Sequence, residues 1–203
     1  MTSAPPTAAV LLIGDEILSG RTKDKNLGFI ADYMTALGID LKEARLVPDV
    51  EEEIVAALNA LRTRYSYVFT TGGIGPTHDD ITADAVARAP GFQMGNVFVM
   101  AGVPKIMNAM MEDVATRLTR GIPMQSRNVE FRGGEGDAAQ PLGQIQRLYP
   151  NVVIGSYPFQ APDGFATNLV LRSRDLQALE EAYQAVCRMA QALTAEGKAR
   201  GWA

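Results

Sequence analysis

The sequence predicts an α/β protein with a mainly parallel sheet, followed by a small α+β appendage. Short apolar runs alternate with segments of helical period through residues 1–119, which is typical of βαβ units. Glycines and acidic residues follow these runs, as is usual where a strand turns into a helix. After residue 119 the pattern changes to β-α-β-β-α, so we expect a second, smaller subdomain over residues 120–203.

The first domain is expected to have three layers, with helices on the two faces of a sheet. An apolar strand over residues 8–13 precedes a helix with an apolar face, which ends at Gly38. A second strand covers residues 39–47, and Asp49 with Glu52 has the spacing of a capping box for the next helix. Buried strands over residues 65–69 and 97–100 follow, and Pro104 opens another helix.

The second subdomain is predicted from strands at residues 125–131, 152–156 and 165–171 and from two helices. A short helix covers residues 137–148, and a long one runs from residue 175 to about residue 196. The turn residues Pro162, Asp163 and Gly164 indicate that the last two strands form a hairpin. The single cysteine, Cys187, falls on the apolar pattern of the long helix, so we expect it to pack rather than react.

Composition narrows the function classes. With 47% hydrophobic and 21% charged residues, the 203-residue chain is typical of a soluble globular protein. A net charge of -4 argues against a nucleic-acid partner. No run approaches the roughly 20 apolar residues of a membrane span, and the first residues lack a signal pattern. We therefore expect a cytoplasmic protein with no membrane partner.

Special residues are densest in the loop that follows the third strand, residues 70–82. Its three glycines permit positive φ and close approach of the backbone to a ligand, while N–H groups at the start of a helix attract anions. Asp79 and Asp80 are adjacent like charges, which a divalent cation such as Mg²⁺ would relieve. The alternative is purely structural, because any strand-to-helix turn favours Gly, Asp and Thr.

Two other strand ends carry polar residues, and open α/β sheets bind ligands just beyond such ends. One is Gly14-Asp15-Glu16, and the other is Gly102-Val103-Pro104. We expect these segments and the glycine loop to meet, with Asp15 in contact with a ligand. Glu16 either contacts the ligand as well, or caps a helix, or pairs with Arg21 or Lys23. Ser19, Asp24 and Asn26 either hydrogen-bond a polar ring or cap the first helix.

These motifs resemble the molybdopterin-binding domain family of the MoaB, Mog and CinA type, which also stands at the front of eukaryotic FAD synthases. The resemblance is carried by GDEILSGRT at residues 14–22, TGGIGPTHDD at residues 71–80 and Gly-Val-Pro at residues 102–104. Ile-Gly-Ser-Tyr-Pro at residues 154–158 also looks like the CinA N-terminal kind, so nearly the whole chain is covered. The resemblance implies a mainly parallel sheet between helices and a homo-oligomer.

The resemblance also implies a site for a phosphorylated pterin (molybdopterin) or a nucleotide, together with Mg²⁺ or another divalent ion. Asp80 matches an aspartate that helps to hold metal or phosphate, and Asp84 matches an acidic residue at the start of the next helix. Asp79 and Asp80 are accordingly expected as metal ligands and catalytic residues. The expected binding residues are Gly14, Asp15, Glu16, Ser19, Asp24, Asn26, Thr71, Gly72, Gly73, Gly75, Thr77, Asp84, Gly102 and Pro104.

Three functional classes stay open. The first is a molybdopterin-binding or adenylyl-transfer domain of molybdenum cofactor biosynthesis. The second is a Mg²⁺-dependent pyrophosphatase acting on ADP-ribose-type nucleotides, to which some competence- or damage-inducible CinA-type proteins are linked. The third is a non-catalytic regulatory module, since Ala101 replaces the family's usual proline and a stretch that relatives carry is missing.

The missing stretch is also visible in the local pattern. Thr82 should begin a crossover helix, yet Pro90 stops it after two turns, whereas a βαβ crossover needs at least about 10–12 residues. Relatives carry several dozen more residues at this point. We therefore expect that a segment is absent near residues 88–91.

Overall fold

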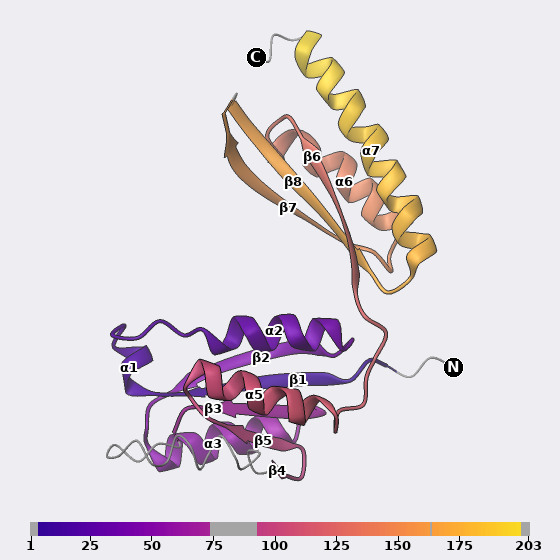
Figure 1. Ribbon diagram of the computed structural model, residues 1–203. Helices are drawn as coiled ribbons and strands as arrows, with labels where there is room; N and C mark the ends of the chain where they lie inside the picture. Colours follow the sequence, from indigo (N-terminus) through magenta and orange to yellow (C-terminus); the bar gives the residue numbers. More distant parts are fainter. Residues whose placement is uncertain (1–3, 74–92, 163, 200–203) are drawn as a thin grey trace. The chain divides into compact units, whose positions relative to one another are not determined.

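The structure is a computed structural model that describes residues 4–73, 93–162 and 164–199. The chain divides into two compact units, residues 1–123 and residues 124–203, which are described one at a time (Figure 1). Within the described ranges, no helix combines the length and the apolar character that crossing a bilayer requires.

Unit 1, residues 1–123, is built on a mainly parallel sheet in the order β2-β1-β3-β5-β4. The parallel strands are β1 (Thr7–Ile13), β2 (Asp40–Val47), β3 (Tyr67–Thr71) and β5 (Val97–Met100). The two-residue β4 (Gln93–Met94) pairs antiparallel with β5 at the sheet edge and was not expected from the sequence. The predicted fold class is confirmed.

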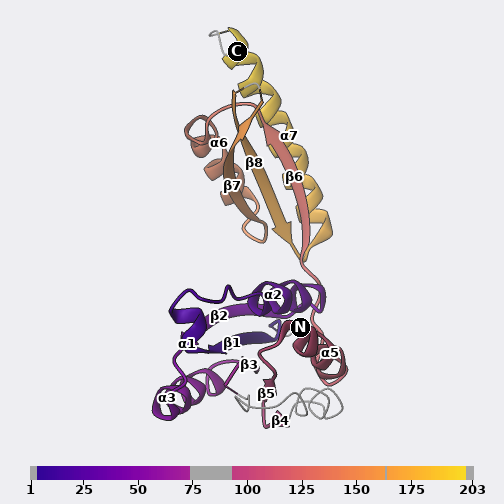
Figure 2. The same ribbon diagram turned by 60° about the vertical axis from the view of Figure 1, so that its left-hand side comes forward.

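Helices cover both faces of this sheet. Helices α2 (Asn26–Ala36) and α5 (Pro104–Ala115) pack on one face, and α3 (Glu51–Arg62) packs on the other (Figures 1 and 2). Alternate residues of β1 serve the two cores, since Val10 and Leu12 face α2 and α5 whereas Leu11 and Ile13 face α3. Burial on both faces explains why β1 is a continuous apolar run rather than an alternating one.

The predicted capping box before α3 is wrong. The residue that precedes this helix is Val50, and no side chain caps its first turn. Asp49 is engaged elsewhere, because one of its carboxylate oxygens accepts a hydrogen bond from the N–H of Asp15, in the turn after β1. Three successive glutamates in the first turn, residues 51–53, still favour the helix, since negative charge is stabilised at a helix N-terminus.

The chain leaves unit 1 through a contact between two glycines. Gly38, at φ 73°, follows the end of α2, and the Gly121 N–H donates to Leu37 O at 2.9 Å. A Cβ on Gly38 would lie 2.4 Å from Gly121 C, and one on Gly121 would lie 2.2 Å from Gly38 O. Only glycine permits two backbones to approach this closely, so the chain stays attached to unit 1 as far as residue 121.

Unit 2, residues 124–203, is an antiparallel sheet in the order β6-β8-β7 with helices packed against it. Its strands are β6 (Gln125–Phe131), β7 (Val153–Ala161) and β8 (Gly164–Ser173), and its helices are α6 (Glu135–Leu148) and α7 (Leu176–Ala199). The register ends with Ala161 opposite Gly164, which confirms the predicted hairpin. A separate core of Phe131, Leu169 and Leu171 with helix residues fills the space between sheet and helices.

Cys187 on α7 is half-buried. A hydrogen bond with Cys187 raises the pKa of Tyr183, one turn earlier on the same helix, above its ordinary value. The apolar face predicted for this helix packs into the core through Leu179, Ala182 and Val186.

Candidate ligand site at the carboxyl edge of the sheet

The parallel register brings three strand ends to one edge of the unit 1 sheet. Leu12 pairs with Thr71, and Thr71 with Met100, so β1, β3 and β5 finish at the same level. The turn after β1 also contacts β2, because the Gly14 N–H donates to Val47 O at 3.1 Å. Polar segments that are distant in the sequence therefore lie together at this edge.

Asn26, at the start of α2, ties two of these strand ends together. Its Nδ2 donates to Thr71 Oγ1 at 2.6 Å and to Gly102 O at 2.7 Å, and Thr71 Oγ1 donates to Ala101 O at 3.2 Å. Asn26 is 4% exposed. Among the residues that the structure describes, no donor lies within hydrogen-bonding distance of its Oδ1. One acceptor of a buried amide next to the strand ends thus has no partner in the described part of the chain.

Glycines allow the ends of β3 and β1 to touch. Gly72 and Gly73 have φ values of 88° and 65°. A Cβ on Gly72 would lie 2.0 Å from Ile13 O, and one on Gly73 would lie 2.8 Å from Ile13 Cγ2. A Cβ on Gly102 would lie 3.2 Å from the Cα of Gly72. These glycines are therefore needed for contact between the strand ends, whatever else they do.

Carboxylates lie beside the turn after β1. The Asp15 N–H donates to Asp49 Oδ2 at 3.1 Å, so the turns after β1 and β2 each place an aspartate at this edge. Asp15 is exposed, and Glu16 is half-buried in the short helix α1 (Asp15–Leu18). Asp49 is not among the site residues predicted from the sequence, which assigned it to a helix cap instead. The sequence does contain a signal for Asp49: like Asp15, it follows soon after a predicted strand.

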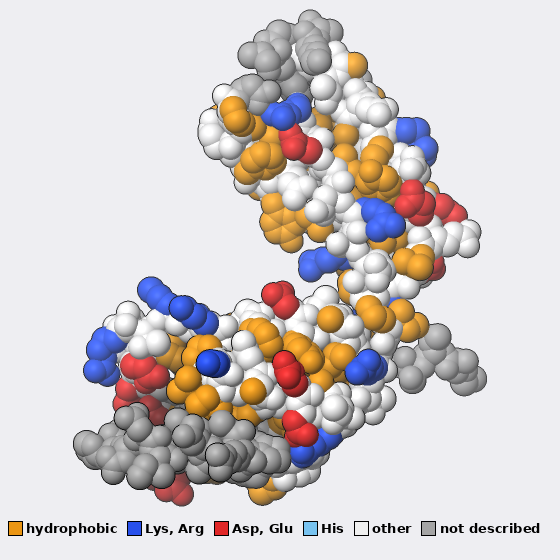
Figure 3. Space-filling view, in the orientation of Figure 1, with side chains coloured by type: hydrophobic (Ala, Val, Ile, Leu, Met, Phe, Trp, Pro, Cys, Tyr) orange, Lys and Arg blue, Asp and Glu red, His pale blue; other side chains and the backbone are white. Residues whose placement is uncertain are grey.

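Charges of both signs surround α1. Figure 3 shows Lys and Arg side chains together with Asp and Glu side chains over this end of unit 1. Arg21 Nε donates to Ser19 Oγ at 3.1 Å, and Ser19 Oγ donates to Glu16 O at 3.2 Å, so Ser19 bonds within its own turn. The ion pairs seen among the described residues do not include one from Glu16 to Arg21 or Lys23.

Asp24 caps α2. Its carboxylate oxygens accept hydrogen bonds from the Leu27 N–H at 2.9 Å and from the Asn26 N–H at 3.3 Å. Of the two roles left open for Asp24, helix capping is the one that these contacts show. Pro104 occupies the first turn of α5, where its missing N–H costs nothing, and it is exposed.

Several predicted site residues lie outside the described residues. They are Gly75, Thr77, Asp79, Asp80 and Asp84, and the expected deletion near residues 88–91 lies there too. Within the described ranges, no group of three or more His, Cys, Asp or Glu side chains is arranged to hold a metal ion. The assignment of a divalent ion to Asp79 and Asp80 thus stays a prediction.

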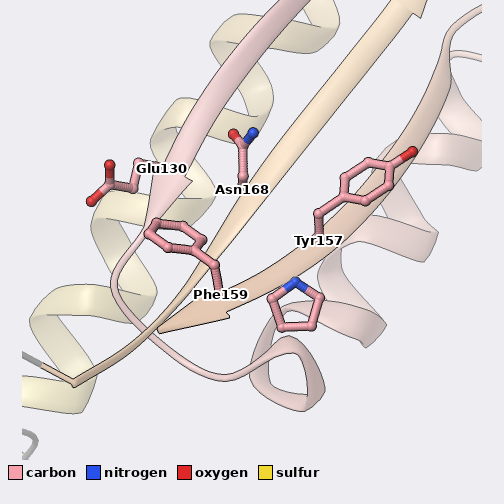
Figure 4. Close-up of a pocket in the computed structure, with 5 residues that line it drawn as sticks. Glu130, Tyr157, Phe159 and Asn168 are labelled. Atoms are coloured by element: carbon pink, nitrogen blue, oxygen red, sulfur yellow. The ribbon is translucent and has the colours of Figure 1, made fainter. Parts of the chain in front are cut away.

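Unit 2 has a hollow of about 460 Å³ on the sheet face opposite its helices (Figure 4). Glu130, Asn168 and Tyr157 are direct neighbours across β6, β8 and β7, and Phe159 lies beside them. The Glu130 carboxylate already pairs with Arg132 Nη2 at 2.7 Å. The residues that line the hollow therefore offer aromatic surface but no cluster of charged groups for an anionic ligand. The strand ends of unit 1 are the better candidate site.

Two family models match the chain, one for each unit. Residues 9–95 match the model of a probable molybdopterin binding domain, and residues 123–196 match the model of the FAD synthase middle domain. The N-terminal part of the chain is therefore similar to molybdopterin-binding domains.

The chain is also similar to individual proteins. A CinA-like protein of Citrifermentans bemidjiense is 48% identical over 86 residues, which are 42% of this chain but only 21% of that protein. A protein of Pyrobaculum calidifontis is 29% identical over 212 residues, with 75% of this chain and 81% of that protein covered. A crystal structure of a CinA protein of unknown function from Thermoplasma acidophilum superposes with a TM-score of 0.47 at 23% identity, covering 56% of this chain and 98% of that one.

Proposed function

We propose that unit 1 binds a small phosphorylated ligand, a pterin or a nucleotide, together with a divalent ion at the carboxyl edge of its sheet. The observation that carries the proposal is the hydrogen-bonded joining of separate strand ends. Asn26 links Thr71 to Gly102, and Asp15 links to Asp49, so five polar or glycine positions from distant segments share one edge. The match of residues 9–95 to the molybdopterin-binding model supports the same ligand class.

The parts of this edge suit different parts of such a ligand. Aspartate oxygens are ligands that Mg²⁺ prefers, and phosphate oxygens usually serve as further ligands of the same ion. Asp15 and Asp49 lie at the edge, and the sequence adds Asp79 and Asp80 from the glycine loop. The neutral amide of Asn26 suits an uncharged ring better than a phosphate.

A Mg²⁺-dependent nucleotide pyrophosphatase is the second candidate. The observation in its favour is the pair of carboxylates of Asp15 and Asp49 at the same edge, because a metal ion between carboxylates and a pyrophosphate would stabilise charge that develops during hydrolysis. The FAD synthase middle-domain match of residues 123–196 is compatible with nucleotide chemistry. Binding of a nucleotide without its hydrolysis would instead leave a regulatory module.

The deciding experiment uses the whole chain with two ligands. Incubation with ADP-ribose and Mg²⁺, followed by chromatography, measures the AMP released by hydrolysis. Titration calorimetry with a pterin phosphate and Mg²⁺ measures binding alone. Pterin binding without AMP release supports the first candidate, and AMP release supports the second. A chain that neither binds nor hydrolyses either ligand contradicts both.

Asp80→Asn tests the metal assignment. If Asp80 holds the ion, losing its charge lowers ligand affinity or turnover by at least tenfold, equivalent to about 1.4 kcal/mol, with the melting temperature of the ligand-free chain unchanged. Asp32→Asn is the matched control, because Asp32 is an exposed residue of α2. Identical ligand titrations for the two variants would remove Asp80 from the site.

A further inference from the structure

We propose that the side-chain oxygen of Asn26 selects ligands that present an N–H donor. The proposal rests on the proposed function and deepens it, since it names the part of the ligand that one residue recognises. The ligand class is an amino-substituted heterocycle, such as an aminopurine or a pterin, with its donor edge against Asn26 and its phosphate elsewhere along the sheet edge.

The contacts of Asn26 fix its side chain in one orientation. Gly102 O can only accept, and Thr71 Oγ1 uses its proton on Ala101 O, so both positions require the NH₂ group of Asn26. An amide flipped by 180° would set oxygen against oxygen at Gly102. Oδ1 is therefore committed as an acceptor, and it cannot turn into a donor to suit a different ligand.

The amide that carries this oxygen lies against an exposed residue of the edge, although the oxygen itself is buried. Asn26 itself is 4% exposed, whereas Gly102, whose carbonyl contacts the same amide, is exposed. A buried acceptor without a partner is rare in proteins and costs free energy, so a group that arrives with a donor relieves that cost. A ligand atom with a lone pair at the same point would be repelled, which makes the site selective as well as attractive.

Pairs of ligands that differ in one donor test the proposal on the unmodified chain. AMP carries an exocyclic amino group, and purine riboside 5′-monophosphate lacks it. A pterin phosphate carries a 2-amino group, and its 2-deamino counterpart has hydrogen there. We expect the amino member of the pair that binds to bind about tenfold more tightly by titration calorimetry. Equal affinities within each pair would overturn the proposal.

The variant Asn26→Leu assigns the selectivity to this residue. It removes the oxygen, so we expect the affinity ratio within a pair to fall to about one even if both affinities drop. Asn108→Leu is the matched control, because Asn108 Oδ1 on α5 is likewise buried and without a partner among the described residues. The control should keep the tenfold ratio. A ratio that persists in Asn26→Leu would overturn the assignment.

The outcomes separate this inference from the function beneath it. Binding of a phosphorylated ligand with no preference for the amino member overturns the inference alone. Failure of all these ligands to bind the unmodified chain overturns the proposed function, and the inference falls with it. If Asn26→Leu does not fold, the ligand pairs measured on the unmodified chain still decide whether donor selectivity exists.

Discussion

At the scale of single residues, Gly72 shows how tightly the strand ends are packed. It combines a left-handed backbone, with φ at 88°, and a position where a Cβ would overlap Ile13 O. The two costs are separate in origin. A left-handed conformation costs a non-glycine residue about 1–2 kcal/mol, and overlap with backbone adds strain that no side-chain rotation can relieve.

Gly72→Ala should lower the free energy of unfolding of unit 1 by more than about 2 kcal/mol, measured by urea denaturation with circular dichroism. Gly95→Ala is the matched control. Gly95 has φ at 62°, but a Cβ there would meet no heavy atom within 4 Å, so only the conformational cost of about 1 kcal/mol applies. Equal losses in the two variants would mean that β3 and β1 do not meet as described.

The hydrogen-bonding roles of Asp24 and Asn26 differ in how well they can be predicted from the sequence, although the two residues are close in the chain. The capping role of Asp24 is a local one, because its partners are two and three residues away, and it was among the predicted alternatives. The partners of Asn26 lie 45 and 76 residues along the chain, so only the folded sheet brings them together. Asp49 was misassigned for the same reason, since a nearby cap was visible and the distant turn of Asp15 was not.

At the scale of elements, Glu43 joins strand β2 to the turn between α3 and β3. Tyr65 Oη donates to Glu43 Oε2 at 2.6 Å, and Arg45 Nε lies 2.6 Å from Glu43 Oε1. The hydrogen bond from Tyr65, assisted by Arg45, lowers the pKa of Glu43 below its ordinary 4.5. The same hydrogen bond, followed by burial, raises the pKa of Tyr65 above its ordinary 10.0.

These two shifts predict opposite pH dependences. The Glu43 contribution to stability is present above about pH 4.5 and is lost as the pH falls through the lower pKa of the folded state. The Tyr65 contribution is present below about pH 10 and is lost as the pH rises through the higher pKa of the folded state. Tyr65→Phe should flatten the melting-temperature profile at both ends, and Tyr33→Phe on α2 should leave it unchanged. A profile that stays equally steep in Tyr65→Phe would contradict the link.

The sequence predicted long, well-patterned elements better than short or half-exposed ones. The two-residue β4 carries too few residues to show any period. Strands β7 and β8 were predicted shorter than they are, because one face of their sheet lacks covering helices and carries polar or isolated aromatic side chains, such as Asn168 and Phe159. Strand β1, which is buried on both faces, was predicted within one residue.

At the scale of the whole molecule, each unit closes its own core. The two clusters of unit 1 draw on residues between 8 and 118, and the cluster of unit 2 draws on residues between 129 and 193. The family models divide the chain in the same region, since one ends at residue 95 and the other starts at residue 123. The sequence pattern predicts a boundary at 119/120, and the contact of Gly121 with Gly38 keeps two further residues on unit 1.

We therefore expect a chain cut after Pro123 to give two pieces that each fold. The measurement is circular dichroism of the separate pieces, whose spectra should sum to that of the intact chain, with a cooperative thermal transition in each. A piece that is unfolded alone but folds when its partner is added would show that the two cores depend on each other.

The half-buried thiol of Cys187 allows the unfolding of unit 2 to be followed separately within the intact chain. The sequence contains one cysteine, so a maleimide dye attaches at a single, known place without any engineered substitution. Since α7 belongs wholly to unit 2, fluorescence from the dye reports the melting of that half, while the intact chain remains the sample.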